Sequence, residues 1–526
     1  MRAKVKVSLI AAATTFSMLL VTGCSAGNTG TGATEWTNTT DDSSEPVTGG
    51  TLRVIEVAQP TGFDPVQVFS STSMPVTYSA LYGQFVVTDP ATGEYKCGMC
   101  ESFTTGDSGA TWDIVLPAGM IFSDGTPLDA AALKFNWDRM KDPALGSASA
   151  GVASQIEHIE IVDSRTVKLH MVVPTPGFIG LMPIYALQWI ASPAALQKGQ
   201  EAFNKNPIGA GPFRFESWTP GGTLELVRNP DYHGTPAHLD GLQIQGVADE
   251  TQRLNALVAG QADMVLSSNA TTFQEAGATG YTPVVYTFNG GVGFMLNTAK
   301  APFDDVRARQ ALSYALDLEQ ISAAVDRGNG TVPATLFQQD SPFHENIPLH
   351  THDPAKAQQL FDELAREGEP VEFAYTVFPG PSAVVFDALQ AQLAQYDNVE
   401  VVADQRDTSE MGVVTTGGDY QAVNSSLAFV DPASRLWGAL NGSADRTNYS
   451  RIDDPALNGA LEAAGNAGTQ SERKEQYRLV QERLADQVPY ILYQSYYNGA
   501  IVSDKVHGVT MYGYTTPAAG DLWLQP

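Results

Sequence analysis

Basic residues are scarce in this chain of 526 residues, and their scarcity bears on the partners it can have. The chain has 30 Lys and Arg against 58 Asp and Glu, so its formal net charge is −28. A surface this acidic repels a phosphate backbone, which argues against a nucleic acid partner. The same charge keeps a protein soluble outside the cell, and we assign it that role.

Motifs of enzymatic chemistry are also missing. The sequence contains no G-x-S-x-G nucleophile motif, no Walker or dinucleotide-binding glycine pattern and no H-E-x-x-H. Gly209 and Gly211 do not form a phosphate loop, because no Lys-Ser/Thr follows them and a strand is expected next. We therefore predict that the protein is not an enzyme and needs no cofactor.

Cysteine is limited to Cys24, Cys97 and Cys100. The pair Cys97-Gly-Met-Cys100 is compatible with a disulfide, half of a metal site or a redox pair. A zinc site needs further ligands, and no second cysteine pair exists. A thioredoxin-type motif opens a helix, whereas residues 101–103 are typical of a strand. In an exported protein the disulfide is favoured, with free thiols or redox activity as the alternatives.

Histidine clusters only in the loop expected over residues 330–354, at His344, His350 and His352. Their spacing matches no zinc pattern, and Pro348 prevents a helical presentation of the first. We expect solvated loop histidines and no metal site.

The N-terminus has the pattern of a secretory leader. Arg2, Lys4 and Lys6 precede an apolar run over residues 7–21, which is too short for a stable membrane span. The following Val-Thr-Gly-Cys resembles a bacterial lipobox, so we expect a signal peptide over residues 1–23 and a diacylglycerol-modified Cys24. Residues 24–50 are rich in Gly, Ser, Thr, Asn and Asp, which predicts a flexible tether.

The remaining chain is too long for one core, and its alternating strands and helices predict an α/β protein of two or three units. Four helix starts carry capping signals: Thr126 ahead of Pro127, Asp304 after Pro302, Asp353 ahead of Pro354, and Thr469 with Glu472 in a capping box. From the second start, apolar spacing predicts a single helix that continues to Gly328.

Three strings in the sequence are similar to one protein family. They are FSDGTPL with a later W-x-R-M (residues 122–140), NPIGAGPFRFESWTPGG (206–222) and PFDDVRARQALSYALD (302–317). Together they resemble the family 5 extracellular solute-binding proteins, which serve ABC importers for peptides, nickel and opines. The resemblance covers nearly all of the chain after the leader.

The resemblance implies a two-lobed periplasmic-binding-protein fold of class II, or cluster C. It assigns residues 51–285 to lobe one, with an inserted subdomain near residues 85–200. Residues 286–492 form lobe two, and residues 493–526 return to lobe one. The protein would be a monomer, anchored by its lipid to the outer face of the cytoplasmic membrane, that presents its solute to ABC permease subunits.

The resemblance also places a ligand between the lobes, at the crossings and at a loop of lobe two. The ligand-binding residues that it implies are Phe69, Ser70, Ser71, Asn289, Phe294, Asn424, Phe429, Asp431, Trp437, Tyr493 and Tyr496. We expect a peptide or peptide-like solute. The alternatives are an oligosaccharide, a metal chelate or an opine-like compound, a ligand-sensing role and, least favoured, an extracellular hydrolase.

One position departs from the family pattern. Peptide-binding members carry an Asp shortly before an Asp-Pro pair, where it binds the ligand's ammonium group, but this chain has Ala428 there, ahead of Asp431 and Pro432. A buried ammonium without a counter-ion costs several kcal/mol. A free-amino peptide is therefore disfavoured unless Asp431 or another acid replaces the missing carboxylate.

Overall fold

A computed structural model describes residues 36–40, 44–68, 74–89, 94–407, 410–444, 447–467, 469–511, 513 and 517–526. The strands are β1 (Thr51–Glu56), β2 (Val86–Thr88), β3 (Tyr95–Cys97), β4 (Ser102–Thr104), β5 (Thr111–Val115), β6 (Ile156–Ile161), β7 (Thr166–Met171), β8 (Phe213–Trp218), β9 (Leu224–Arg228), β10 (Gly241–Gly246), β11 (Met264–Ser267), β12 (Thr282–Thr287), β13 (Val292–Leu296), β14 (Val371–Val377), β15 (Val399–Gln405), β16 (Ala422–Ser426), β17 (Tyr490–Gln494), β18 (Tyr497–Val502), β19 (Val506–His507) and β20 (Trp523–Leu524).

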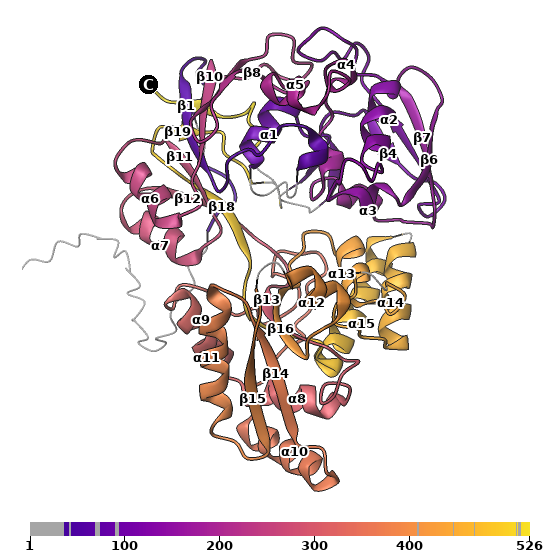
Figure 1. Ribbon diagram of the computed structural model, residues 1–526, viewed down its shortest axis with the longest axis vertical. Coiled ribbons are helices and arrows are strands. Elements are labelled where there is room, and N and C mark those ends of the chain that lie inside the picture. Colours follow the sequence, from indigo (N-terminus) through magenta and orange to yellow (C-terminus); the bar gives the residue numbers. More distant parts are fainter. Residues whose placement is uncertain are drawn as a thin grey trace, which may run out of the picture. The chain divides into compact units, whose positions relative to one another are not determined.

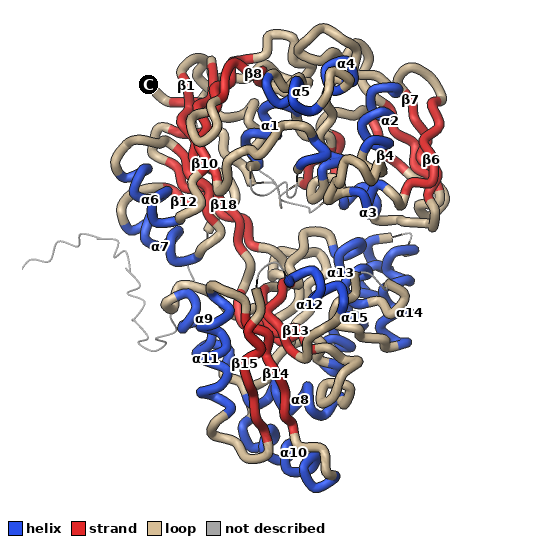
Figure 2. The backbone as a smooth tube through the Cα atoms, in the orientation of Figure 1, coloured by secondary structure: helices blue, strands red, loops and turns tan. Residues whose placement is uncertain are grey.

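Helices of very different length connect these strands (Figure 2). The α-helices are α1 (Pro75–Tyr82), α2 (Ala130–Arg139), α3 (Ala150–Ala153), α4 (Pro193–Leu196), α5 (Gln200–Lys205), α6 (Glu250–Val258), α7 (Ala270–Ala278), α8 (Val306–Ala315), α9 (Leu318–Asp326), α10 (Pro354–Glu367), α11 (Pro381–Leu393), α12 (Met411–Gly417), α13 (Pro432–Leu440), α14 (Pro455–Asn466) and α15 (Gln470–Gln487). The 3-10 helices are η1 (Pro65–Gln67), η2 (Phe178–Leu181) and η3 (Ala186–Gln188). No helix among the described residues is long and apolar enough to cross a membrane.

Lobe one, as we use the name, comprises the elements around a seven-stranded sheet of order β12-β18-β11-β1-β10-β9-β8 (Figure 1). Successive side chains of β1 point to opposite faces of the sheet, and each face contacts a different core. Leu52 and Val54 point into the main core of lobe one, whereas Ile55 points into a smaller core that contains Leu257 of α6 and Phe273 of α7. The sheet is therefore buried on both sides, as expected for strands that pair in parallel with crossover helices.

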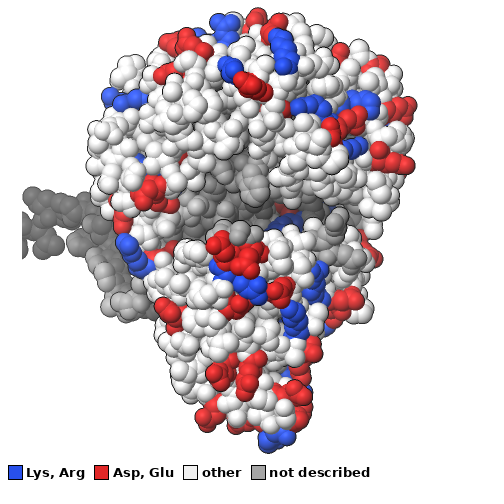
Figure 3. All heavy atoms as spheres, in the orientation of Figure 1, with Lys and Arg blue, Asp and Glu red and all other residues white. Residues whose placement is uncertain are grey.

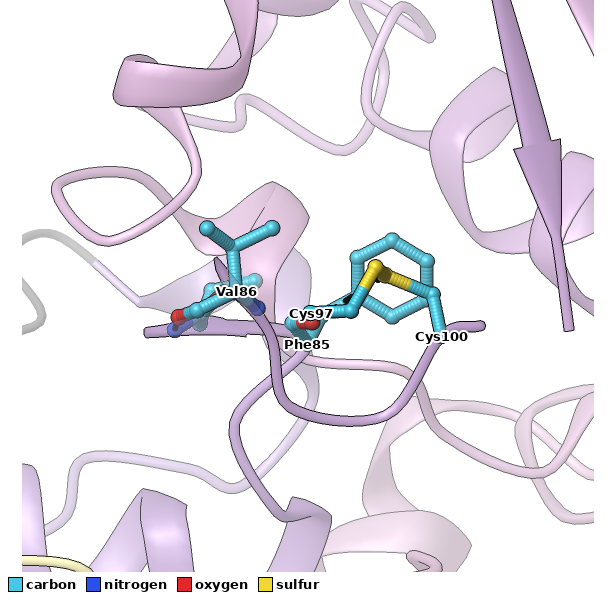
Figure 4. The surroundings of a disulfide bond; sticks show 5 residues. Phe85, Val86, Cys97 and Cys100 are labelled. Carbon is cyan, nitrogen blue, oxygen red and sulfur yellow. Dashed lines mark hydrogen bonds between the residues drawn. A yellow bond between two sulfur atoms is a disulfide. The ribbon is translucent and has the colours of Figure 1, made fainter. Parts of the chain in front are cut away.

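A second, four-stranded sheet of order β4-β5-β7-β6 lies within lobe one, and the pair β2-β3 precedes it. The disulfide between Cys97 and Cys100 closes the turn between β3 and β4 (Figure 4). Cys97 pairs with Val86 across the two strands, and the backbone N–H of Gly98 donates to the Phe85 carbonyl at 3.0 Å. The bond thus secures a short turn against its neighbouring strand, which fits a structural role.

Lobe two comprises the elements around a five-stranded sheet of order β15-β14-β16-β13-β17. Val371, Phe373 and Tyr375 alternate along β14 toward one core, which also holds apolar residues of α8, α9, α10 and α11. The opposite face carries Met295 and Val423 in a smaller core beneath α12. Helices α13, α14 and α15 pack together in a further core beside this sheet.

Two expected helix starts differ from the structure. The helix near Thr126 has Asp129 as its N-cap, whose side chain accepts from the N–H of Ala132. The single helix expected over residues 302–328 is two helices, α8 and α9. Asp305 caps the first, and Leu316 then adopts an extended conformation before Asp317 caps the second. The apolar spacing continues through this region, but the N-cap at Asp317 starts a new helix there.

The tether expected over residues 24–50 does not extend freely to residue 50. Trp36 packs its ring edge-on against Phe273 and Tyr497, with centroids 5.5 and 5.1 Å apart. The carbonyl of Thr37 accepts from the N–H of Val285 in β12 at 2.8 Å. A free tether would therefore end before Trp36.

A buried ion pair joins η1 to α2. Asp64 is fully buried, and both of its carboxylate oxygens accept from Arg139, at 3.0 and 2.8 Å. Asp64 also caps η1 by accepting from the N–H of Val66. Because the carboxylate has no access to water, the charge of Arg139 is needed to offset the free-energy cost of burying it.

We predict that Arg139→Met lowers the free energy of unfolding by about 3–5 kcal/mol, because it leaves the Asp64 carboxylate buried without a counter-ion. Lys205→Met is the matched control. It removes an ion pair with Glu201 whose side chains are 73% and 88% exposed, and it should cost less than about 1 kcal/mol. Urea denaturation measures both values, and equal losses would contradict the assignment.

A second buried acid positions α1 next to the sheet of lobe one. Glu56, the last residue of β1, is 1% exposed. Its carboxylate accepts from the N–H of Val76 at 2.7 Å and from the N–H and hydroxyl of Thr77 at 3.2 and 2.5 Å. Burial raises its pKa to about 7, against these hydrogen bonds.

Because the folded state binds this proton more tightly than the unfolded chain, we predict that stability falls between about pH 4.5 and pH 7. The loss attributable to Glu56 is about 3 kcal/mol. Glu56→Gln keeps an acceptor and cannot ionise, so its free energy of unfolding should decline by about 3 kcal/mol less than that of the wild type over this pH range. Glu275→Gln, at an exposed position, should decline as the wild type does. Denaturation curves across this pH range would contradict the account if wild type and Glu56→Gln ran parallel.

Candidate functional site

Two chain segments cross between the lobes side by side. Residues 288–291 connect β12 to β13, and residues 495–496 connect β17 to β18. The strands on both sides are antiparallel neighbours, since β12 pairs with β18 and β13 with β17. The N–H of Phe288 donates to the Tyr496 carbonyl at 3.0 Å between them. The crossings therefore form a short two-stranded connection that carries the chain from one lobe to the other.

Glycine is required where the first crossing approaches its neighbours. Gly290 has a φ of +70°, and a Cβ there would lie 2.1 Å from the Leu427 carbonyl oxygen. A Cβ on Gly293 would lie 2.1 Å from the carbonyl oxygen of Ile491. Both contacts are with backbone, which cannot move aside as a side chain can.

The loop between β16 and α13, residues 427–431, runs beside the first crossing. Asn289 and Phe429 exchange backbone hydrogen bonds, both of 3.0 Å. The Asn289 side chain donates to the Val430 carbonyl at 3.2 Å and accepts from the N–H of Gln338 at 2.8 Å. Both the NH2 group and the oxygen of this side-chain amide are therefore hydrogen-bonded, and they hold the loop in place.

An apolar cluster forms where this loop meets the crossings. Phe288, Ala428 and Val430 are buried together, with Tyr286 and Tyr496 partly buried against them. Phe288 and Tyr496 make an edge-on contact with centroids 5.1 Å apart. Between the lobes the molecular surface is hollowed (Figure 3), and this cluster lies at the chain crossings that join the two sides.

Three of the aromatic residues expected to bind ligand are packed inside lobe two. Phe294, Phe429 and Tyr493 are each at most 1% exposed. The rings of Phe294 and Tyr493 lie 5.4 Å apart, and Phe429 contacts Phe337 at 5.4 Å. The Tyr493 hydroxyl donates to Asn424 Oδ1 at 2.8 Å. In this structure these three residues belong to the packed interior of lobe two.

The other expected ligand-binding residues differ in exposure, and some lie outside the described residues. Trp437 of α13 is 39% exposed, and Tyr496 and Asn424 are partly exposed. Four of the predicted functional positions lie outside the described residues: Cys24, Phe69, Ser70 and Ser71.

Asp431 is fully engaged within lobe two. Its carboxylate caps α13 by accepting from the N–H of Ala433 at 2.6 Å, and it lies 3.5 Å from Nη2 of Arg473. Burial raises the pKa of Asp431, while the Arg473 charge opposes that rise. Arg473 in turn lies over the ring of Phe343 at 5.2 Å. Asp431 already has its cation, so it does not replace the carboxylate absent at Ala428, which is 4% exposed in the apolar cluster.

Arg435, one helical turn into α13, was missed by the sequence reasoning. Its Nη2 donates to the Ser426 carbonyl at 2.6 Å. Burial raises the pKa of Tyr185, in lobe one, and the Arg435 charge acts against that rise, so the two groups lie near each other across the lobes. No sequence signal distinguishes this arginine from an ordinary exposed one on an amphipathic helix.

The histidine expectation is wrong for His350. Its Nδ1 lies 3.2 Å from the Ser313 hydroxyl, and its Nε2 is buried without a hydrogen-bond partner. Burial lowers its pKa to about 4. Among the residues with described coordinates, no group of three His, Cys, Asp or Glu side chains is arranged to hold a metal ion.

Known proteins resemble this chain over most of its length. It is 25% identical over 557 residues to heme-binding protein A of Haemophilus influenzae, covering 97% of this chain and 98% of the relative. It is 25% identical over 405 residues to the glutathione-binding protein GsiB of Escherichia coli K12, covering 73% and 74%.

Solved structures share the fold. HbpA2 from Haemophilus parasuis superposes with a TM-score of 0.78 at 22% identity, over 91% of this chain and all of that one. The oligopeptide-binding protein AppA from Bacillus subtilis, in complex with a nonapeptide, gives a TM-score of 0.71 at 20% identity, over 92% of this chain and all of that one.

The superposition on these solved structures confirms the α/β periplasmic-binding-protein fold expected from the sequence. Residues 94–447, more than half of the chain, match the family model described as bacterial extracellular solute-binding proteins, family 5 Middle. The chain belongs to this family of solute-binding proteins.

Proposed function

We propose that this protein is the solute-capturing component of an ABC import system. It binds a peptide or peptide-like solute between lobe one (residues 51–287 and 497–526, with an inserted subdomain near residues 85–200) and lobe two (residues 292–494), and delivers it to a membrane permease. The mechanism is hinge closure. A solute that contacts both lobes stabilises the closed state, and the permease recognises that state.

The observation that carries this proposal is the paired crossing. Residues 288–291 and 495–496 join two lobes that each have a core of their own. A connection this short lets the lobes rotate as rigid bodies, because only a few backbone dihedral angles need to change. The family match supplies the role of such a fold as a solute receptor.

The solute class is argued from charge and from the relatives. Asp431 is occupied by Arg473 and an N-cap, and Ala428 offers no carboxylate. A free ammonium group would therefore lack a counter-ion at this loop. A peptide whose amino group is blocked, modified or held elsewhere fits better, and one relative is named for glutathione.

A non-peptide solute is the second candidate. One relative that spans nearly the whole chain is named for heme. The apolar cluster of Phe288, Ala428 and Val430 would suit an uncharged or aromatic surface on such a solute.

We further propose that the protein acts as a monomer anchored outside the cytoplasmic membrane by a lipid on Cys24, after removal of residues 1–23. Two acyl chains hold a protein durably at a membrane, whereas one gives only marginal binding. The acidic, exported receptor would then remain near its permease.

Solute capture predicts a ligand-dependent gain in stability. We expect that N-acetylated di- and tripeptides raise the melting temperature by an amount that grows with the ratio of ligand concentration to Kd, since they bind the folded state alone. The same peptides with free amino groups should give a smaller shift. Intrinsic tryptophan fluorescence during heating measures both. Stronger shifts by the free-amino peptides would overturn the argument from Ala428.

Lipidation predicts that Cys24→Ser abolishes incorporation of an alkyne-tagged fatty acid and moves the protein from the membrane fraction to the soluble fraction of its host. The double variant Cys97→Ser, Cys100→Ser is the matched control, because it removes the other two cysteines and should remain labelled. Persistent labelling of Cys24→Ser would show that the fatty acid is attached at another residue and would contradict the proposal for Cys24.

A further inference from the structure

Among the residues that the structure describes, Arg435 is a partly buried cation without an ion-pair partner. Its Nη2 donates a hydrogen bond to the Ser426 carbonyl. Within the chain that the structure describes, no carboxylate lies within ion-pair distance of it. The partly buried Arg473 differs, because it has Asp431. A guanidinium carries five N–H donors, so most of those on Arg435 remain available.

Two buried acids, one in each lobe, have partners of their own. Asp431, four residues before Arg435, is held by Arg473 and by the first turn of α13. Glu56 of lobe one is enclosed by the N–H groups that begin α1. Neither carboxylate can turn toward Arg435 without breaking several hydrogen bonds. Neither of these two acids therefore compensates the charge of Arg435.

Arg435 also lies where the two lobes meet. Helix α13 is placed at the edge of lobe two that faces lobe one, and it contacts η2 of that lobe (Figure 1). Next to it, Val430 lies against Gly513, where an added Cβ would come within 2.9 Å of the valine Cγ2. The Arg435 charge acts on the buried phenols of Tyr185, in lobe one, and Tyr490, in lobe two.

A single carboxylate matches this environment better than a phosphate does. One guanidinium offers two parallel N–H donors to a carboxylate, and it balances one negative charge. The neighbouring groups are neutral phenols, which donate hydrogen bonds but add no charge. A phosphate monoester carries nearly two charges at neutral pH, and the second would stay uncompensated.

We propose that the transported solute carries a carboxylate that forms an ion pair with Arg435 when the lobes close on it. The proposal rests on the proposed solute-binding function and names the solute class for that site. Because the carboxylate is held between α13 and the η2 side of lobe one, this contact favours the closed state over the open one.

The test uses pairs of probes that differ only in a carboxylate. The first set is the tripeptide Ala-Phe-Ala in four forms, with the amino group free or acetylated and the carboxyl group free or amidated. The second pair is maltose and maltobionic acid. Isothermal titration calorimetry with the full chain in mild detergent should show that the free carboxyl form of a bound pair binds about 10–100-fold more tightly.

Arg435→Gln should remove that preference, lowering the affinity for the carboxylate form and leaving the amidated or neutral form unchanged. Arg214→Gln is the matched control, because it removes the same charge from an exposed position on β8. Retention of the wild-type preference in Arg214→Gln and its loss in Arg435→Gln support the proposal. Circular dichroism of both variants verifies that they fold.

The outcomes separate this proposal from the proposed function. Binding of probes with no difference between carboxylate and neutral forms, or a preference that survives Arg435→Gln, overturns the Arg435 assignment and leaves solute capture intact. A failure of all six probes to bind contradicts both.

Discussion

The closeness of the two crossings is the constraint on which the rest of this structure depends. Gly290 in the first crossing and Gly293 in β13 lie within contact of the backbone of Leu427 and Ile491, where any side chain would collide. That packing fixes the second crossing beside the first and the loop of Phe429 beside both. The lobes can therefore move relative to each other only about this short connection, and a solute between them meets a surface built from it.

Burial determines the partners of three carboxylates in this structure. Carboxylates that leave water need a cation or several donors. Asp64 has Arg139, Asp431 has Arg473, and Glu56 has the start of α1. Each acid is thus part of the architecture, although the chain as a whole is strongly acidic. Arg435 differs from these charged groups because no described group of opposite charge pairs with it. We therefore propose that it binds the solute.

Local chemistry explains which features the sequence could predict. The caps of α10 and α15, at Asp353 and Thr469, are short-range patterns, and the structure has them as expected. The break at Leu316 was missed because the apolar spacing continues through it, although Asp317 signalled a second cap. The burial of Phe294 and Tyr493, and the isolation of Arg435, depend on residues hundreds of positions away. No local pattern records such contacts, so the sequence did not single out Arg435.

The central claim is that the lobes close about the paired crossings when solute binds. Small-angle X-ray scattering of the protein with and without a saturating bound probe tests this claim most directly, because the radius of gyration reports the separation of the lobes. The account predicts a smaller radius in the bound state, and no such decrease when substitutions replace Gly290 or Gly293. An unchanged radius on binding would contradict hinge closure as the way this protein captures its solute.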